Sequence, residues 1–208
     1  MALSKNQERA VHHEAGPLLC LAGPGSGKTT VITERTRFLI DEAGISPTEI
    51  LVITFTKAAA LEMKERFYRL LGGRRPPVTF GTFHSVFFWI LRQAYGLNAG
   101  NILKEEQKYQ ILRELLTKYN LEIEDETDFL SGVAGEISLV KNDRIPLENY
   151  YARNCSEELF RKLYKGYQER LEAQRLLDFD DMVVMCYELL RQRGDILSGW
   201  RKRFRYIL

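Results

Sequence analysis

A glycine-rich segment near the N-terminus, AGPGSGKTT at residues 22–30, constrains the fold more than any other part of the sequence. It follows an apolar run, LLCLA at residues 18–22, and precedes a segment of helical character that we expect to span residues 29–42. An apolar strand, a glycine-rich turn and a helix together make up a phosphate-binding P-loop. The sequence therefore predicts a P-loop here, with residues 18–22 as a buried strand.

The side chains of this segment suit a triphosphate bound with Mg²⁺. The usual pattern is Gly, four residues, then Gly-Lys-Ser/Thr; here Ala22 takes the first position. Glycines let backbone N–H groups turn toward phosphate oxygens, Lys28 supplies a mobile positive charge, and the Thr29 hydroxyl can bind the metal. We expect Lys28 and Thr29 to be catalytic and Thr29 to be the metal ligand. The predicted nucleotide-binding residues of the loop are Ala22, Gly23, Pro24, Gly25, Ser26, Gly27, Lys28, Thr29 and Thr30.

The rest of the chain alternates strand and helix signals before it becomes helical. Apolar, β-branched runs at residues 50–55 and 78–83 predict two more strands, each followed by a helix, which together favour a parallel α/β sheet. From residue 104 to about residue 191 the pattern is helical with no convincing strand, and FRYIL at residues 204–208 is strand-like again. The expected fold class is thus an α/β P-loop NTPase with a parallel sheet and an all-helical subdomain that interrupts or follows the α/β layer. Ser4 is expected to begin a first helix that runs to about Glu14.

Composition excludes several classes of protein. Of the 208 residues, 45% are hydrophobic and 28% are charged, which is typical of a globular chain and not of a disordered or fibrous one. No stretch approaches 18 uninterrupted apolar residues, so we expect no membrane span. Three scattered cysteines suit a reducing compartment, and we expect a cytoplasmic protein. A net charge of +2 neither demonstrates nor opposes a nucleic-acid partner.

Four further segments carry candidate binding residues. Gln7, in LSKNQERAV at residues 3–11, has a carboxamide that suits the edge of an adenine. Phe55, in TFTKAAALEM after the second strand, is either a core residue or a platform on which an unpaired base stacks. After the third strand, GTFHS places Thr82 and His84 beside aromatic residues. The fourth segment, LLDFDDMV, has three acidic residues that we expect at a helix N-terminus without a metal: Asp178, Asp180 and Asp181.

Taken in order, the P-loop and these four segments resemble the UvrD/Rep/PcrA-type DNA helicases of superfamily 1. Residues 3–11 match the Q motif of that family, AGPGSGKT matches its motif I, TFTKAAALEM its motif Ia, GTFHS its motif Ib, and LDFDDM the segment before motif II. The resemblance implies a RecA-like P-loop fold with an inserted all-helical subdomain. It places subdomain 1A at residues 1–94, the helical subdomain 1B at residues 95–175, and a return to 1A at residues 176–208 that ends at the Walker B strand.

The same resemblance implies roles for individual residues. Gln7 would read adenine, while Phe55, Thr82 and His84 would face single-stranded DNA. Lys57 would touch a DNA phosphate, although motif Ia commonly reads TFTNKAA and its lysine is shifted here. The implied cofactors are ATP and Mg²⁺, and the implied partners are single-stranded or duplex DNA and the remaining helicase domains. Such proteins unwind DNA in repair, recombination or replication, with a family tendency toward 3′-to-5′ movement.

Hydrolysis of ATP in this fold requires a Walker B carboxylate and an adjacent acid that orients water. The resemblance predicts an Asp-Glu pair directly after Leu208, followed by a second motor domain. We therefore expect this chain to be the N-terminal part of a longer helicase, one that binds ATP but does not hydrolyse it efficiently alone. Two alternatives stay open: a small-molecule kinase with a P-loop, and a non-catalytic DNA-binding module gated by nucleotide.

Overall fold

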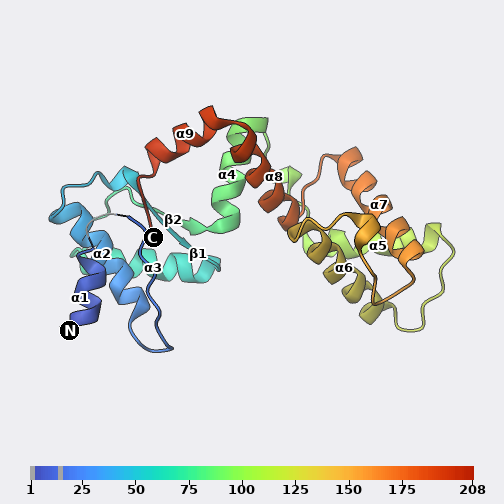
Figure 1. The fold of residues 1–208 in the computed structure, drawn as a ribbon, viewed down its shortest axis with the longest axis horizontal. Helices are drawn as coiled ribbons and strands as arrows, with labels where there is room; N and C mark the ends of the chain where they lie inside the picture. The colour runs from blue at the N-terminus through green and yellow to red at the C-terminus, as the bar shows by residue number, and fades with distance from the viewer. Residues whose placement is uncertain (1–2, 14–15) are drawn as a thin grey trace. The chain divides into compact units, whose positions relative to one another are not determined.

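The computed structural model describes residues 3–13 and 16–208, which divide into two compact units. One unit comprises Met1–Val86 and Arg193–Leu208, and the other comprises Phe87–Gln192. The assignment of residues 95–175 to a subdomain of the 1B type stays a prediction. In the first unit and at its borders the helices are α1 (Lys5–Val11), α2 (Lys28–Asp41), α3 (Lys57–Leu70), α4 (Phe83–Tyr95) and α9 (Gly194–Arg203), with a 3₁₀ turn at Pro47–Glu49 (Figure 1).

The first unit is built on a parallel sheet of three strands among the described residues, as the alternating pattern predicted. The strands are β1 (Ile50–Thr54), β2 (Thr79–Thr82) and β3 (Tyr206–Ile207), in the order β2-β1-β3. Figure 1 labels β1 and β2. Helices α2 and α3 share an apolar core with the sheet that includes Leu39, Val52 and Phe67. Because Thr54 of β1 is in register with Thr82 of β2, both strands end at the same level of the sheet.

The prediction of a buried strand at residues 18–22 is wrong. These residues form no strand, and Leu19 and Leu21 are 84% and 90% exposed. A buried parallel strand depends on ladder hydrogen bonds to its neighbours and on helices that cover both faces of the sheet. The outer strand β3 has two residues, so it presents a very short ladder to any further strand. The first helix ends at Val11, and the expected end at Glu14 lies outside the described residues.

The second unit is helical, as predicted. It contains α5 (Glu105–Lys118), α6 (Glu126–Asn142), α7 (Glu157–Gln174) and α8 (Phe179–Gln192), with 3₁₀ turns at Ala99–Asn101 and Leu147–Asn149. Fifteen buried residues form one core, to which α5 contributes Leu112, α6 contributes Ile137 and α7 contributes Phe160. Within the described part of this unit, the β-type pairing is a single parallel bridge between Ile102 and Leu177.

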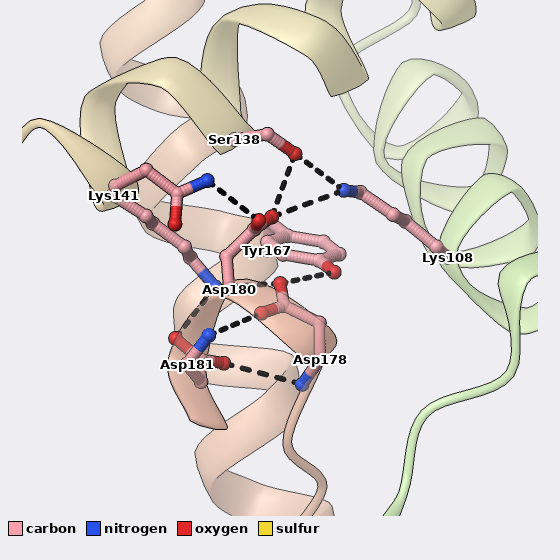
Figure 2. Close-up of polar contacts among 8 residues, drawn as sticks. Lys108, Ser138, Lys141, Tyr167, Asp178, Asp180 and Asp181 are labelled. Atoms are coloured by element: carbon pink, nitrogen blue, oxygen red, sulfur yellow. Dashed lines mark hydrogen bonds and ion pairs between the residues drawn. The ribbon is translucent and has the colours of Figure 1, made fainter. Parts of the chain in front are cut away.

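The acidic segment at the start of α8 is anchored by a buried lysine, forming what we call the Lys141 cluster: Lys141, Tyr167, Asp178 and Asp181 (Figure 2). The Lys141 ammonium donates to Asp178 at 2.7 Å and lies 2.8 Å from Asp181. The Tyr167 hydroxyl also donates to Asp178, at 2.9 Å. Asp178 accepts from the backbone N–H of Asp181 at 2.8 Å, so it caps α8 as the sequence predicted for a helix N-terminus.

Burial and charge act in opposite directions on the two carboxyl groups of the Lys141 cluster. Burial alone would raise the pKa of Asp178, but the Lys141 ammonium and the hydrogen bonds outweigh it and hold that pKa below its ordinary value. Burial and the neighbouring Asp178 raise the pKa of Asp181. The lysine thus offsets the charge of the buried Asp178 and the half-buried Asp181, and removing it leaves both carboxylates without a counter-charge.

We expect Lys141→Met to lower the free energy of unfolding by about 3–5 kcal/mol at pH 7, the range for breaking a buried ion pair. Without the ammonium, the folded-state pKa of Asp178 rises above the unfolded value and that of Asp181 rises further above it, so protonation favours the folded state. The decrease in the free energy of unfolding caused by Lys141→Met should therefore become smaller as the pH falls from 7 to 5. Urea unfolding followed by circular dichroism at both pH values measures it.

Lys162→Met is the matched control on α7. Its ammonium is exposed and lies 3.5 Å from Glu158 one turn away, so we expect a change within about 0.5 kcal/mol at either pH. Equal losses for the two variants would contradict a structural role for the Lys141 cluster.

Candidate nucleotide-binding site

The predicted phosphate loop turns through two glycines with left-handed backbone conformations. Gly25 has φ +72° and Gly27 has φ +83°, values that side chains with a Cβ rarely adopt. Gly27 is the N-cap of α2, and its carbonyl accepts from Val31 at 3.0 Å. The turn at Gly27 thus places the N-terminus of α2, with its unpaired N–H groups and positive dipole end, directly after the loop.

The Lys28 side chain folds back over this loop. Its ammonium donates to the carbonyl of Gly23 at 2.8 Å and to that of Ala22 at 3.4 Å. The Ser26 hydroxyl donates to the same Gly23 carbonyl at 2.7 Å. Lys28 and Ser26 are both exposed, so a phosphate group from solvent can reach the ammonium and replace these carbonyls as its partner.

Gln7 contacts the loop directly, which the sequence did not predict. Its Nε2 donates to the carbonyl of Ser26 at 3.0 Å, and its Oε1 accepts from the Ser4 N–H at 2.8 Å. The second bond belongs to a capping box at the start of α1. A Cβ added at Gly27 would lie 2.8 Å from Gln7 Nε2, so the glycine permits this close approach.

Arg35 is a residue of the site that sequence reasoning missed. It lies on α2, and its guanidinium donates to three backbone carbonyls at the end of α1, those of Ala10, Val11 and His13. Burial lowers the pKa of this guanidinium. In the sequence, Arg35 is visible only as an arginine within the amphipathic pattern of a helix. That pattern does not reveal a hydrogen-bond partner more than 20 residues away.

A cavity of about 940 Å³ lies beside the loop, within the range of ligand sites in proteins. It brings together α1, the loop, α2 and the end of β3; its lining includes Gln7, Ala22, Gly23, Ser26, Lys28 and Arg35. The other predicted nucleotide-binding residues, Pro24, Gly25, Gly27, Thr29 and Thr30, do not line it. Thr29 and Thr30 are half-buried in the first turn of α2.

The predicted DNA-contacting residues gather where β1 and β2 end. Phe55, directly after β1, is 86% exposed, so it is not a core residue. Its ring lies 5.3 Å from that of Phe83, directly after β2, a neighbour that the sequence analysis did not single out. Lys57 is exposed in the first turn of α3, and His84 is half-buried. Thr82 accepts through its hydroxyl from the Ser85 N–H at 3.1 Å, so this hydroxyl also serves the start of α4.

Within the described residues, no group of three or more His, Cys, Asp or Glu side chains is placed to hold a metal ion. The fit of Mg²⁺ rests on the Thr29 hydroxyl, because magnesium at phosphate sites takes few protein ligands and is held largely by the phosphates and water. The loop itself fits a triphosphate: two left-handed glycines, a helix N-terminus and an ammonium converge on one segment.

The UvrD/REP helicase N-terminal domain matches residues 3–208. The chain belongs to this family, as the five segments predicted. A putative ATP-dependent DNA helicase, YjcD of Bacillus subtilis, is 36% identical over 214 residues, covering 100% of this chain and 28% of the relative. The ATP-dependent DNA helicases PcrA of Staphylococcus aureus and Staphylococcus epidermidis are each 34% identical over 212 residues, covering 99% of this chain and 29% of the relative.

This member of the UvrD/REP family therefore spans less than a third of the length of these curated relatives. The match agrees with the prediction of an N-terminal helicase region. In the described part of the chain, no helix combines the length and apolar character needed to cross a bilayer.

We expect Gly27→Ala to lower the free energy of unfolding by about 1–2 kcal/mol, the cost of a left-handed conformation for a residue with a Cβ. The added methyl group should also displace Gln7 Nε2 from the loop. Urea unfolding measures the first effect. Gly199→Ala is the control: it lies within α9 with no atom within 4 Å of an added Cβ, and better helix propensity should leave stability unchanged or slightly raised. Equal destabilisation by both substitutions would contradict the assigned role of Gly27.

Proposed function

We propose that this chain is the ATP-binding N-terminal part of an ATP-dependent DNA helicase. The observation that carries the proposal is the meeting of Gln7 and the Lys28 loop at one cavity, in a chain whose relatives are named ATP-dependent DNA helicases. The unwinding of DNA belongs to the whole protein, together with its remaining domains. Its 3′-to-5′ direction, its role in repair, recombination or replication, and its cytoplasmic location stay predictions.

In the proposed complex, the N–H groups at the start of α2 and the Lys28 ammonium bind the phosphates of ATP. The Thr29 hydroxyl is a ligand of Mg²⁺, which neutralises the phosphate charge. Gln7 reads the adenine through its carboxamide. Because both ends of that carboxamide already have backbone partners, adenine binding exchanges at least one of these hydrogen bonds, and the net gain per contact is small.

The Phe55–Phe83 pair supports a binding surface for single-stranded DNA. An exposed phenyl ring at the end of a strand offers an apolar face on which a base of any sequence can stack. Lys57, two residues after Phe55, adds a positive charge for the DNA backbone. We propose that Phe55 carries the stacking contact and that Lys57, Thr82 and His84 contact the strand around it.

Binding of both ATP and single-stranded DNA distinguishes a helicase segment from a small-molecule kinase. A helicase segment binds single-stranded DNA weakly, with little sequence preference and with strong salt dependence, whereas a kinase does not bind it at any salt concentration. Fluorescence anisotropy of labelled oligonucleotides, with and without an ATP analogue, distinguishes the two. We also propose that the chain alone does not hydrolyse ATP efficiently; robust DNA-stimulated ATPase activity would contradict this.

Lys28→Ala should weaken ATP binding by at least about tenfold, because hydrogen bonds to charged groups contribute about 1.5–3 kcal/mol each. Titration with a fluorescent ATP analogue in the presence of Mg²⁺ measures the dissociation constant. Lys64→Ala is the control, since that ammonium lies on α3 over the Tyr68 ring and should not affect the affinity. An unchanged affinity of the Lys28 variant would refute the assigned site.

Phe55→Ala should weaken single-stranded DNA binding by about 5- to 150-fold, since base stacking on an aromatic ring contributes about 1–3 kcal/mol. Leu70→Ala is the control: it also removes a partly exposed apolar side chain, but at the other end of α3, about 20 Å from Lys57 along the helix. Anisotropy at low salt measures both. Equal affinities of the two variants would place the DNA elsewhere.

A further inference from the structure

Helix α1 carries Gln7, yet it cannot fix its own position. It has seven residues, far fewer than a helix needs to be stable in isolation. Its buried side chains, Ala10 and Val11, pack by non-directional apolar contact that leaves small rotations of the helix inexpensive. The position of the Gln7 carboxamide relative to the phosphate loop therefore depends on directional contacts at the two ends of α1.

One directional contact at the C-terminal end comes from Arg35. Its Nη1 lies 2.8 Å from the carbonyl oxygen of His13, 2.9 Å from that of Val11 and 3.3 Å from that of Ala10. The carbonyls of Ala10 and Val11 are at the negative end of α1, where a cation is favourable, and the carbonyl of His13 follows just beyond the helix. Arg35 is half-buried, so its hydrogen bonds are shielded from competing water.

Arg35 and the phosphate-binding residues belong to the same rigid element. Arg35 follows Lys28 by seven residues on α2, which places it about 10 Å along the helix on nearly the same side. Helix α2 therefore presents the phosphate-binding ammonium in its first turn and, two turns later, the cation that holds the adenine-reading helix. Both residues line the same cavity.

We propose that Arg35 is a positioning residue that sets the preference of the site for adenine over other bases by fixing α1, and with it Gln7, relative to the phosphate loop. This inference rests on the proposed function. Arg35 does not touch the phosphates in this account, so its loss should leave their binding unchanged. Loss of base preference with retained affinity for a phosphate chain is the signature that separates this role from a general contribution to folding.

The test compares ATP, GTP and inorganic tripolyphosphate, each with Mg²⁺, by competition against a fluorescent ATP analogue. In Arg35→Gln we expect the ratio of GTP to ATP dissociation constants to fall by about three- to tenfold. This is the range for the loss of one neutral hydrogen bond, here the one proposed between Gln7 and adenine. The affinity for tripolyphosphate should stay within about twofold of wild type. Arg35→Lys, which keeps a cationic donor, should restore most of the preference.

Arg37→Gln is the matched control. It lies two residues further along α2, where its guanidinium pairs with Glu34 at 2.9 Å and with Glu42 at 3.5 Å on the outer side. All three affinities should match those of wild type. If Arg35→Gln does not fold, as judged by circular dichroism, Arg35→Met replaces it, because it keeps the apolar stem and removes the donors.

A double-mutant cycle with Gln7→Ala tests whether Arg35 acts through Gln7. If it does, Arg35→Gln should not reduce the ATP preference further in the Gln7→Ala background. The inference is overturned by additive losses, by a retained ATP preference in the Arg35 variant, or by a wild-type chain that binds ATP and GTP equally. A wild-type chain that binds neither ATP nor tripolyphosphate would overturn the proposed function instead.

Discussion

The backbone turn at Gly27 fixes where α2 begins, and both halves of the proposed nucleotide site depend on it. The left-handed φ of +83° sends the chain from the loop into the helix, so the helix N-terminus and Lys28 follow the loop directly. The missing Cβ also leaves room for Gln7, which approaches from α1 and bonds to Ser26. The absence of a side chain at Gly27 therefore serves both the proposed phosphate site and the contact of α1 with the loop.

Local patterns in the sequence predicted most elements of this fold but few of its contacts. The β-branched run of β1 is a property of neighbouring residues, so this strand was predicted to within one residue of its observed ends. The apolar run at residues 18–22 carries the same kind of signal, yet it forms no strand, since a strand also needs partners that a local pattern does not contain. The Phe55–Phe83 pair follows from the register of β1 and β2, which no single segment specifies.

The polar interior of the helical unit shows the same limit. The sequence predicted acids at the start of a helix, and Asp178 does cap α8. Its partner Lys141 lies 37 residues earlier in the sequence, and nothing in either segment names the other. The sequence predicted the proposed nucleotide site as incompletely as it predicted the Lys141 cluster. The motif identified Lys28, whereas the bonds from Gln7 to Ser26 and from Arg35 to α1 arise from the packing of α1 on α2.

The bond between Lys28 and the carbonyl of Gly23 has a consequence for how such a loop meets its ligand. The Lys28 ammonium donates to the carbonyl oxygens of Gly23 and Ala22, which would otherwise bind water. An anion that binds the loop must therefore compete with these carbonyls for the ammonium. Lys28 then exchanges a carbonyl partner for an anionic one. Multivalent oxyanions in the buffer compete for the ammonium as well, so the measured affinity for a nucleotide depends on the salt in the solution.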